Sequence, residues 1–123
     1  MKSYKDLEVY KRSYNLAVSI HKFSFTLPRD LQRDLADQIR RASRSIPSCI
    51  AEAYGRSKSS KDVVNLLSDS LGSNDEILFN LEFMKDTNLI KEEIYQKYMT
   101  EYTICGKQLF NLIKYLKKPV TSN

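Results

Sequence analysis

The amino-acid sequence predicts an all-α fold, an antiparallel up-down-up-down four-helix bundle in a single domain of residues 1–119. The 123 residues include only three glycines and three prolines, and so few helix-breaking residues favour long helices over many short strands. Apolar residues recur every three or four positions through four segments, which is the spacing of one helix face. Short polar turns separate the segments, so consecutive helices should pack antiparallel.

The first helix is expected from about Asp6 to about Phe25. Its apolar stripe comprises Leu7, Tyr10, Tyr14, Ala17, His21 and Phe25. The helix should stop before Leu27-Pro28, because the residue that precedes a proline avoids the helical region. His21, the only histidine, lies on this stripe, where we expect it to pack and hydrogen-bond rather than to catalyse.

The second helix is expected from about Asp30 to Tyr54, with Gly55 as a stop because glycine tolerates the left-handed conformation of a helix C-cap. Its stripe comprises Leu31, Leu35, Ile39, Ala42, Ile46, Ile50 and Ala53. Pro47 falls inside this helix, where a proline costs about 3 kcal/mol and frees the carbonyl of Ser43. Three nearby serine hydroxyls are expected to compensate for this kink, those of Ser43, Ser45 and Ser48.

The third helix is expected after a polar turn at residues 57–60, with Ser59 or Ser60 as N-cap, and it should end at Asp86-Thr87-Asn88. Its stripe comprises Val63, Leu67, Leu71, Asn74, Leu78 and Leu81. The fourth helix is expected from about Lys91 to Lys117, ended by Pro119 and followed by a disordered tail at 120–123. Its stripe comprises Ile94, Tyr98, Tyr102, Cys105, Leu109, Leu112 and Leu116.

The composition is that of a globular, mildly basic protein. Hydrophobic residues make up 41% and charged residues 28% of the chain, and the formal net charge is +5, which makes an anionic partner plausible. The polar start and the lack of a long apolar run argue against a signal peptide and a membrane span, so we expect a cytoplasmic protein. Cys49 and Cys105 are expected to be reduced thiols.

Three motifs in a fixed order extend over nearly the whole chain. The first is Tyr4-Lys5-Asp6-Leu7-Glu8-Val9-Tyr10, followed by Leu27-Pro28. The central motif comprises Gln38, Ile39, Arg40, Arg41, Ala42, Ser45, Ile46, Pro47, Ile50, Ala51, Glu52, Gly55 and Arg56. The last comprises Gly72, Ser73 and Glu76. With these motifs the sequence resembles the 23S rRNA intervening-sequence proteins, a family of four-helix bundles, although Cys49, Ala53 and Asn74 depart from its pattern.

The resemblance implies a ring-like homo-oligomer, often a pentamer. A related accessory protein of diversity-generating retroelements binds nucleic acid and a reverse transcriptase. The activity of the family itself is not implied by its name, which describes a gene location.

A row of arginines on the second helix is the candidate nucleic-acid surface. On a wheel of 100° per residue, Arg29, Arg33, Arg40 and Arg44 fall between about 80° and 140° from Ile39, outside the core stripe. Residues 29–61 hold eight basic and four acidic side chains, and Arg56 and Lys58 belong to this excess. Arginine binds phosphate bidentately. The alternative is a solvated face whose arginines pair with aspartates or with a neighbouring subunit.

Other polar residues of the motifs have structural interpretations. Glu52 is spaced to pair with Arg56, or Glu52 or Glu76 could reach Arg41 across helices. Gly72-Ser73 and Gly106 are expected to permit close helix approach. No catalytic, cofactor or metal motif is present, so we expect a non-enzymatic protein that binds structured RNA; the alternative is an oligomeric protein–protein scaffold whose tyrosines form contacts.

Overall fold

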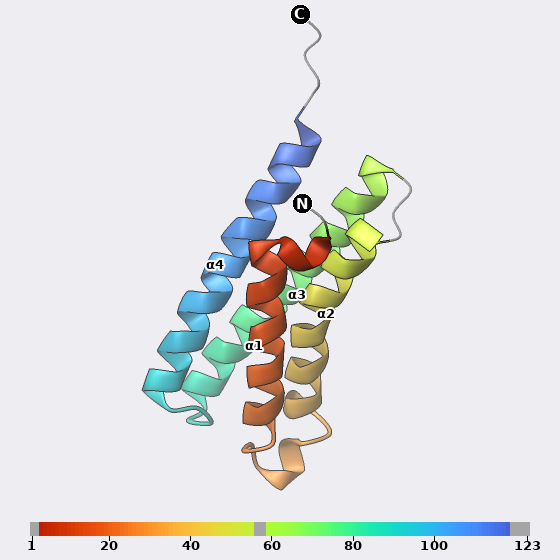
Figure 1. Ribbon diagram of the computed structural model, residues 1–123. Helices are drawn as coiled ribbons and strands as arrows, with labels where there is room; N and C mark the ends of the chain where they lie inside the picture. Colours follow the sequence, from red (N-terminus) through yellow and green to blue (C-terminus); the bar gives the residue numbers. More distant parts are fainter. Residues whose placement is uncertain (1–2, 56–58, 119–123) are drawn as a thin grey trace, which may run out of the picture.

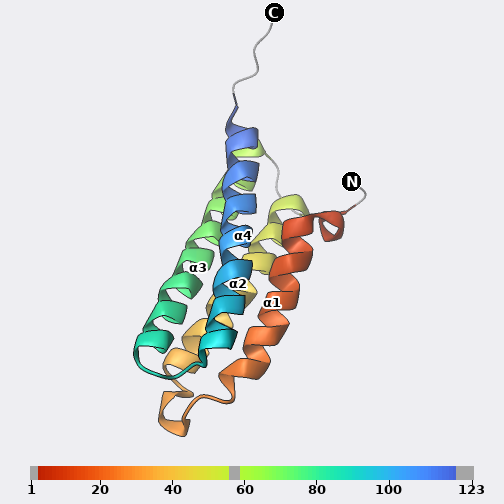
Figure 2. The same cartoon turned by 90° about the vertical axis from the view of Figure 1, so that its left-hand side faces the viewer.

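The computed structural model describes residues 3–55 and 59–118, which form the predicted four-helix bundle (Figure 1). Its long helices are α1 (Glu8–Ser24), α2 (Leu35–Gly55), α3 (Ser60–Asp86) and α4 (Glu92–Lys117). Two short 3-10 helices, η1 (Tyr4–Asp6) and η2 (Arg29–Leu31), precede α1 and α2. Each helix packs against the one before it and α4 returns to α1. Consequently α1 and α3 lie at opposite sides of the bundle (Figure 2).

The start of α3 is confirmed and the start of α2 is not. The Ser59 hydroxyl caps α3 by accepting a hydrogen bond of 3.2 Å from the backbone N–H of Asp62. Between α1 and α2 the side chain of Gln32 donates to the carbonyls of Ser24 and Leu27, both at 2.9 Å. This side chain holds the connection in a turn, so α2 begins at Leu35 and not at Asp30.

The expected left-handed cap after the second helix is wrong. Gly55 is the last residue of α2, and no glycine in the described ranges has a positive φ. Pro119 and the predicted tail at 120–123 lie outside the described residues. No helix within the two described ranges is long and apolar enough to cross a membrane.

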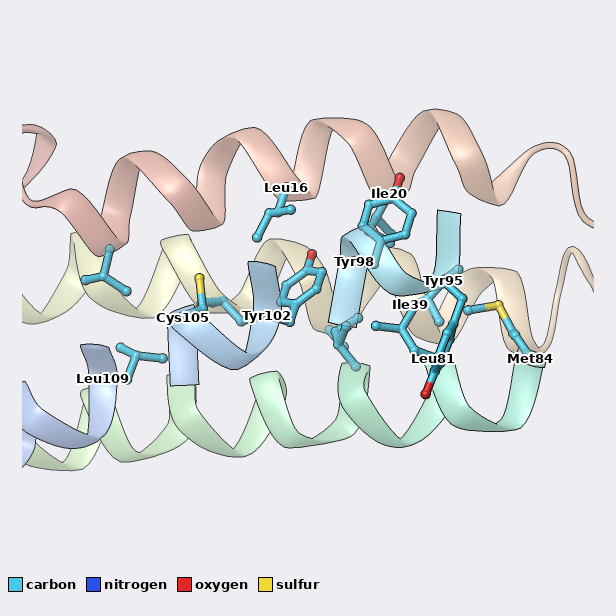
Figure 3. Packing of buried hydrophobic residues seen from close by; sticks show 14 of the residues in the cluster. Leu16, Ile20, Ile39, Leu81, Met84, Tyr95, Tyr98, Tyr102, Cys105 and Leu109 are labelled. Carbon is cyan, nitrogen blue, oxygen red and sulfur yellow. The ribbon is translucent and has the colours of Figure 1, made fainter. Parts of the chain in front are cut away.

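All four helices contribute to the core, and the predicted stripes of the second and fourth helices supply a large share of it (Figure 3). From α2, the buried residues include Leu35, Ile39, Ala42, Ile46, Ile50 and Ala53. From α4, Tyr98, Tyr102, Cys105 and Leu109 are buried as predicted, whereas Ile94 is exposed and Tyr95 takes its place. Figure 3 shows Tyr102 pointing in among residues that include Leu16 of α1.

The stripe predicted for the first helix is apolar, but only part of it meets the core. Ala17 is buried as predicted, and Leu7 and Tyr10 pack partly buried against the core, but Tyr14, His21 and Phe25 are exposed. The other core residues of α1 are Val9, Leu16 and Ile20 with Ser13 and Ser24. At 100° per residue the two faces differ by about 90°. The expectation of a packed His21 is therefore wrong, and α1 carries a second apolar face beside the core.

Pro47 is buried inside α2, and its surroundings differ from the prediction. The Ser43 hydroxyl donates to the carbonyl of Arg40 at 3.0 Å, and the Ser45 hydroxyl accepts from Ser73 of α3 at 2.9 Å. Neither compensates the freed Ser43 carbonyl. A second polar contact between α2 and α3 comes from Ser70, whose hydroxyl donates to the carbonyl of Ile46 at 2.7 Å.

A buried side-chain hydrogen bond joins α3 to α4. The fully buried Asn74 donates from Nδ2 to the carbonyl of Tyr102 at 2.9 Å. A Cβ at Gly106 would lie 3.0 Å from that same nitrogen, so Gly106 permits this close approach as predicted. Gly72 does not share that role, because a Cβ there would meet nothing within 4 Å.

The two cysteines are expected to differ in reactivity. Cys105 is completely buried, and desolvation raises the pKa of its thiol from 9.0 to about 12, whereas Cys49 is only half-buried. At pH 8 a disulfide reagent should label the folded protein once, at Cys49, and label Cys105 only after unfolding, because the thiolate is the reactive species.

The raised pKa of the Cys105 thiol also predicts how the free energy of unfolding changes at alkaline pH. A thiol in the unfolded chain ionises near 9.0 while the folded thiol stays neutral to about 12, so the stabilisation is full below pH 9 and is lost as the pH rises from 9 to 12. In the labelling experiment, a Cys49→Ser variant whose remaining thiol, Cys105, reacts rapidly at pH 8 would contradict the burial of Cys105.

Candidate functional site

The structure does not bring the four predicted arginines into one row on the second helix. Arg29 is exposed in η2 and Arg33 is exposed in the turn before α2, so only Arg40 and Arg44 lie on α2. The prediction placed all four arginines on one continuous helix that begins at about residue 30. The predicted row is wrong because α2 begins only at Leu35. Arg56 and Lys58 lie outside the described residues.

Arg40 is a structural residue of the α1–α2 connection. Its guanidinium donates to the Ser24 hydroxyl at 2.7 Å, to the Gln32 side-chain oxygen at 3.1 Å and to the Gln32 carbonyl at 2.8 Å. It also lies 4.6 Å from the centre of the Phe25 ring, a cation–π contact. With its donors turned inward, Arg40 cannot act as the outward phosphate ligand that the sequence predicted.

Arg44 lies instead on the rim of an apolar groove between α1 and α2. The groove has a volume of about 400 Å³. Its walls are formed mainly by the second apolar face of α1 and by Pro47 and Ala51 of α2, and its basic rim by Arg44 and Lys22. Tyr14 and Val18 are 51% and 41% exposed there, which is unusual for adjacent large apolar side chains on a small domain. We call this feature the α1/α2 groove.

The remaining motif residues are distributed over the surface. Arg41 pairs with Asp37 at 3.0 Å within α2 and is 74% exposed, so the alternative of a cross-helix pair with Glu52 or Glu76 is wrong; both glutamates are exposed. Gln38 donates to Asp34 at 3.3 Å. The predicted pairing of Glu52 with Arg56 stays a prediction, because Arg56 lies outside the described residues.

A second basic surface, which the motifs did not single out, lies on the C-terminal half of α4 and on its C-cap residue. It comprises Lys107, Lys114, Lys117 and Lys118, all exposed. Spacings of seven and three residues place Lys107, Lys114 and Lys117 on one helix face, and Lys118 is the C-cap residue that follows the helix. A hollow of about 430 Å³ is lined by three of these lysines with Phe110 and Ile113. We call this surface the α4 lysine face.

The signal for the α4 lysine face was present in the sequence. Residues 102–118 contain four lysines and no Asp or Glu, but lysines at a helix C-terminus are also what the helix dipole favours. The structure adds that Phe110 is 58% and Tyr115 73% exposed within the same segment. Basic side chains with interleaved aromatic rings are a combination that binds single-stranded or looped nucleic acid.

The described residues offer no group of three or more His, Cys, Asp or Glu side chains placed to hold a metal ion. The α4 lysine face can neutralise an anion, and the α1/α2 groove can bury apolar side chains.

Comparisons with known proteins agree with this architecture. Residues 5–111 match the family model of the 23S rRNA-intervening sequence protein. A crystal structure from Bacteroides thetaiotaomicron, described as a protein of unknown function from the S23 ribosomal protein family, shares 29% identity with a TM-score of 0.78; the match covers 86% of this chain and 95% of that chain. No curated protein matches the sequence. The chain belongs to the 23S rRNA-intervening sequence protein family.

Proposed function

We propose that this protein is a non-enzymatic homo-oligomer that binds structured RNA and works in the cytoplasm, with a ring of five subunits as the assembly that the family resemblance favours. The observation that carries the proposal is the α4 lysine face, four exposed cations with no carboxylate in residues 102–118. Phosphate neutralisation by lysine releases counterions, and this release supplies most of the sequence-independent affinity for nucleic acids.

The dimensions of this face suit a nucleic-acid backbone. Lys107 and Lys117 are ten residues apart on α4, which corresponds to about 15 Å along a helix, enough to contact several successive phosphates. Phe110 and Tyr115 are exposed in the same segment and offer rings on which unpaired bases can stack. Repetition of the face around an oligomer multiplies weak contacts into avidity. Exposed Arg29 and Arg33 form a separate, smaller candidate surface.

The test removes the four lysines and keeps the fold. Lys107→Gln/Lys114→Gln/Lys117→Gln/Lys118→Gln should weaken binding to a structured ribosomal RNA fragment at least tenfold at about 150 mM salt, because each lost phosphate contact lowers the salt slope by about 0.7–0.9. Fluorescence anisotropy over a salt series measures both quantities.

A matched control removes the same charge elsewhere. Lys5→Gln/Lys11→Gln/Lys91→Gln/Lys97→Gln changes four exposed lysines and should cost much less affinity. Equal losses in both quadruple variants would show that net charge alone attracts RNA. Arg29→Gln/Arg33→Gln tests the smaller surface separately.

The second candidate function is a protein–protein scaffold that binds no nucleic acid. The exposed apolar side chains of the α1/α2 groove favour it. Absence of RNA binding at about 150 mM salt, together with a partner that stays bound after nuclease treatment, would select the scaffold. Reproducible turnover of a substrate by the purified protein would contradict both candidates.

A further inference from the structure

The outward side of α3 carries an acidic ridge with two exposed aromatic rings. Phe79 and Phe83 are 68% and 48% exposed and lie one turn apart. The exposed carboxylates around them come from Asp75, Glu76, Glu82 and Asp86. We call these six residues the α3 ridge. Two large apolar side chains fully outside the core of one helix indicate a surface that another molecule covers.

Charge and shape relate the α3 ridge to the α1/α2 groove. Over its length α3 carries six acidic and two basic side chains, whereas α1 carries one acidic and three basic ones. The groove is hollow, apolar and lined in part by Lys22 and Arg44, and the ridge presents two exposed aromatic rings among exposed carboxylates. Complementary potential of this kind selects partners and fixes their register.

We propose that the α3 ridge of one copy of this chain docks in the α1/α2 groove of a second copy, with Phe79 and Phe83 against Tyr14, Val18 and Pro47. This inference deepens the self-association contained in the proposed function. The contact would cover the apolar face of α1 that the bundle core leaves exposed. It also places the carboxylates of the ridge near Lys22 and Arg44 of the neighbour.

The position of the two surfaces decides the kind of assembly. Because α1 and α3 lie at opposite sides of the bundle (Figure 2), two copies cannot bury both groove–ridge pairs in one symmetric dimer. The contact is therefore head-to-tail, and head-to-tail contacts produce closed rings or open filaments. Gly72 lies two turns before Phe79 on the outward side of α3, exposed and with no neighbour that requires a glycine. It leaves room there for a close-packed second copy.

Two variants block one half of the contact each. Phe79→Glu/Phe83→Glu destroys the ridge and keeps the groove, whereas Tyr14→Glu/Val18→Glu destroys the groove and keeps the ridge; all four positions are exposed. Each variant alone should be a monomer by multi-angle light scattering, while the wild-type protein is larger. Mixed in equal amounts at rising concentration, the two variants should form a 1:1 dimer and stop there, because only one groove and one ridge remain intact.

A third variant controls for added charge. Gln96→Glu/Thr100→Glu places two carboxylates at the same spacing on exposed positions of α4 and should keep the wild-type mass. Circular dichroism confirms that all variants fold. A monomeric wild-type protein, variants that keep the wild-type mass, or a mixture that stays monomeric would each overturn the docking.

The outcome is separable from that of the proposed function. None of these substitutions touches the α4 lysine face, so a blocked monomer should still bind RNA with a salt-dependent affinity, reduced by the loss of avidity. A head-to-tail assembly without RNA binding would support the docking and reject the RNA function. RNA binding by a monomeric wild-type protein would do the reverse.

Discussion

Replacement of Arg40 by methionine is expected to lower the free energy of unfolding by about 2–3 kcal/mol. Hydrogen bonds from a charged group contribute about 1.5–3 kcal/mol each, and Arg40 makes three, to Ser24 and Gln32; its partial exposure and the surviving bonds of Gln32 keep the total below their sum. Methionine retains the aliphatic stem, so the loss reports the guanidinium. Urea denaturation followed by circular dichroism measures the effect.

The control is Arg33→Met, at an exposed position outside the helices, where the change should stay within about 0.5 kcal/mol. If the two variants unfold at the same urea concentration, Arg40 does not hold the α1–α2 connection. Arg40→Met should also bind RNA as the wild type does, provided that binding is measured well below the melting temperature of the variant.

Replacement of Tyr102 by alanine is expected to cost about 3–5 kcal/mol, the range for removal of a fully buried aromatic ring. Tyr102 has no exposed surface and lies in the middle of the core (Figure 3). Replacement by phenylalanine should behave differently. The Tyr102 hydroxyl is buried without a hydrogen-bond partner among the described residues, and desolvation strongly raises its pKa.

An unpartnered buried hydroxyl destabilises the fold, so Tyr102→Phe should be neutral or should stabilise the protein by about 1 kcal/mol. Thermal and urea unfolding of both variants beside the wild type measure the two effects. A Tyr102→Phe variant that loses more than about 1 kcal/mol would reveal a hydrogen bond of that hydroxyl to an ordered water.

Periodicity predicted the stripe of the second helix well, because its large apolar side chains lie on one face, whereas α4 also carries exposed Ile94, Phe110 and Tyr115. It failed on the first helix for a physical reason. Tyr10, Tyr14, His21 and Phe25 form an apolar face of their own beside Leu16 and Ile20, and a helix pattern shows which residues share a face but not which face meets the core.

The candidate surfaces required knowledge of long-range contacts. Arg40 reads as an outward residue on a helical wheel, yet its partner Ser24 is sixteen residues away in the chain, and nothing local predicts that contact. Helix α2 starts late because Gln32 folds back on the end of α1, which no cap motif signals. The α4 lysine face was visible in the sequence, but the exposure of Phe110 beside it was not.

The bond between Asn74 and Tyr102 has a consequence for the spacing of the surfaces. A purely apolar α3–α4 contact could slip by a helical turn, whereas a buried amide with one matching carbonyl, opposite one glycine, fits in a single register. That register fixes the height of the lysines on α4 relative to the phenylalanines on α3. Asn74 and Gly106 thus fix the distance along the bundle between the α4 lysine face and the α3 ridge. In an assembly, the RNA-binding surface and the subunit contact would therefore keep the same separation in every copy.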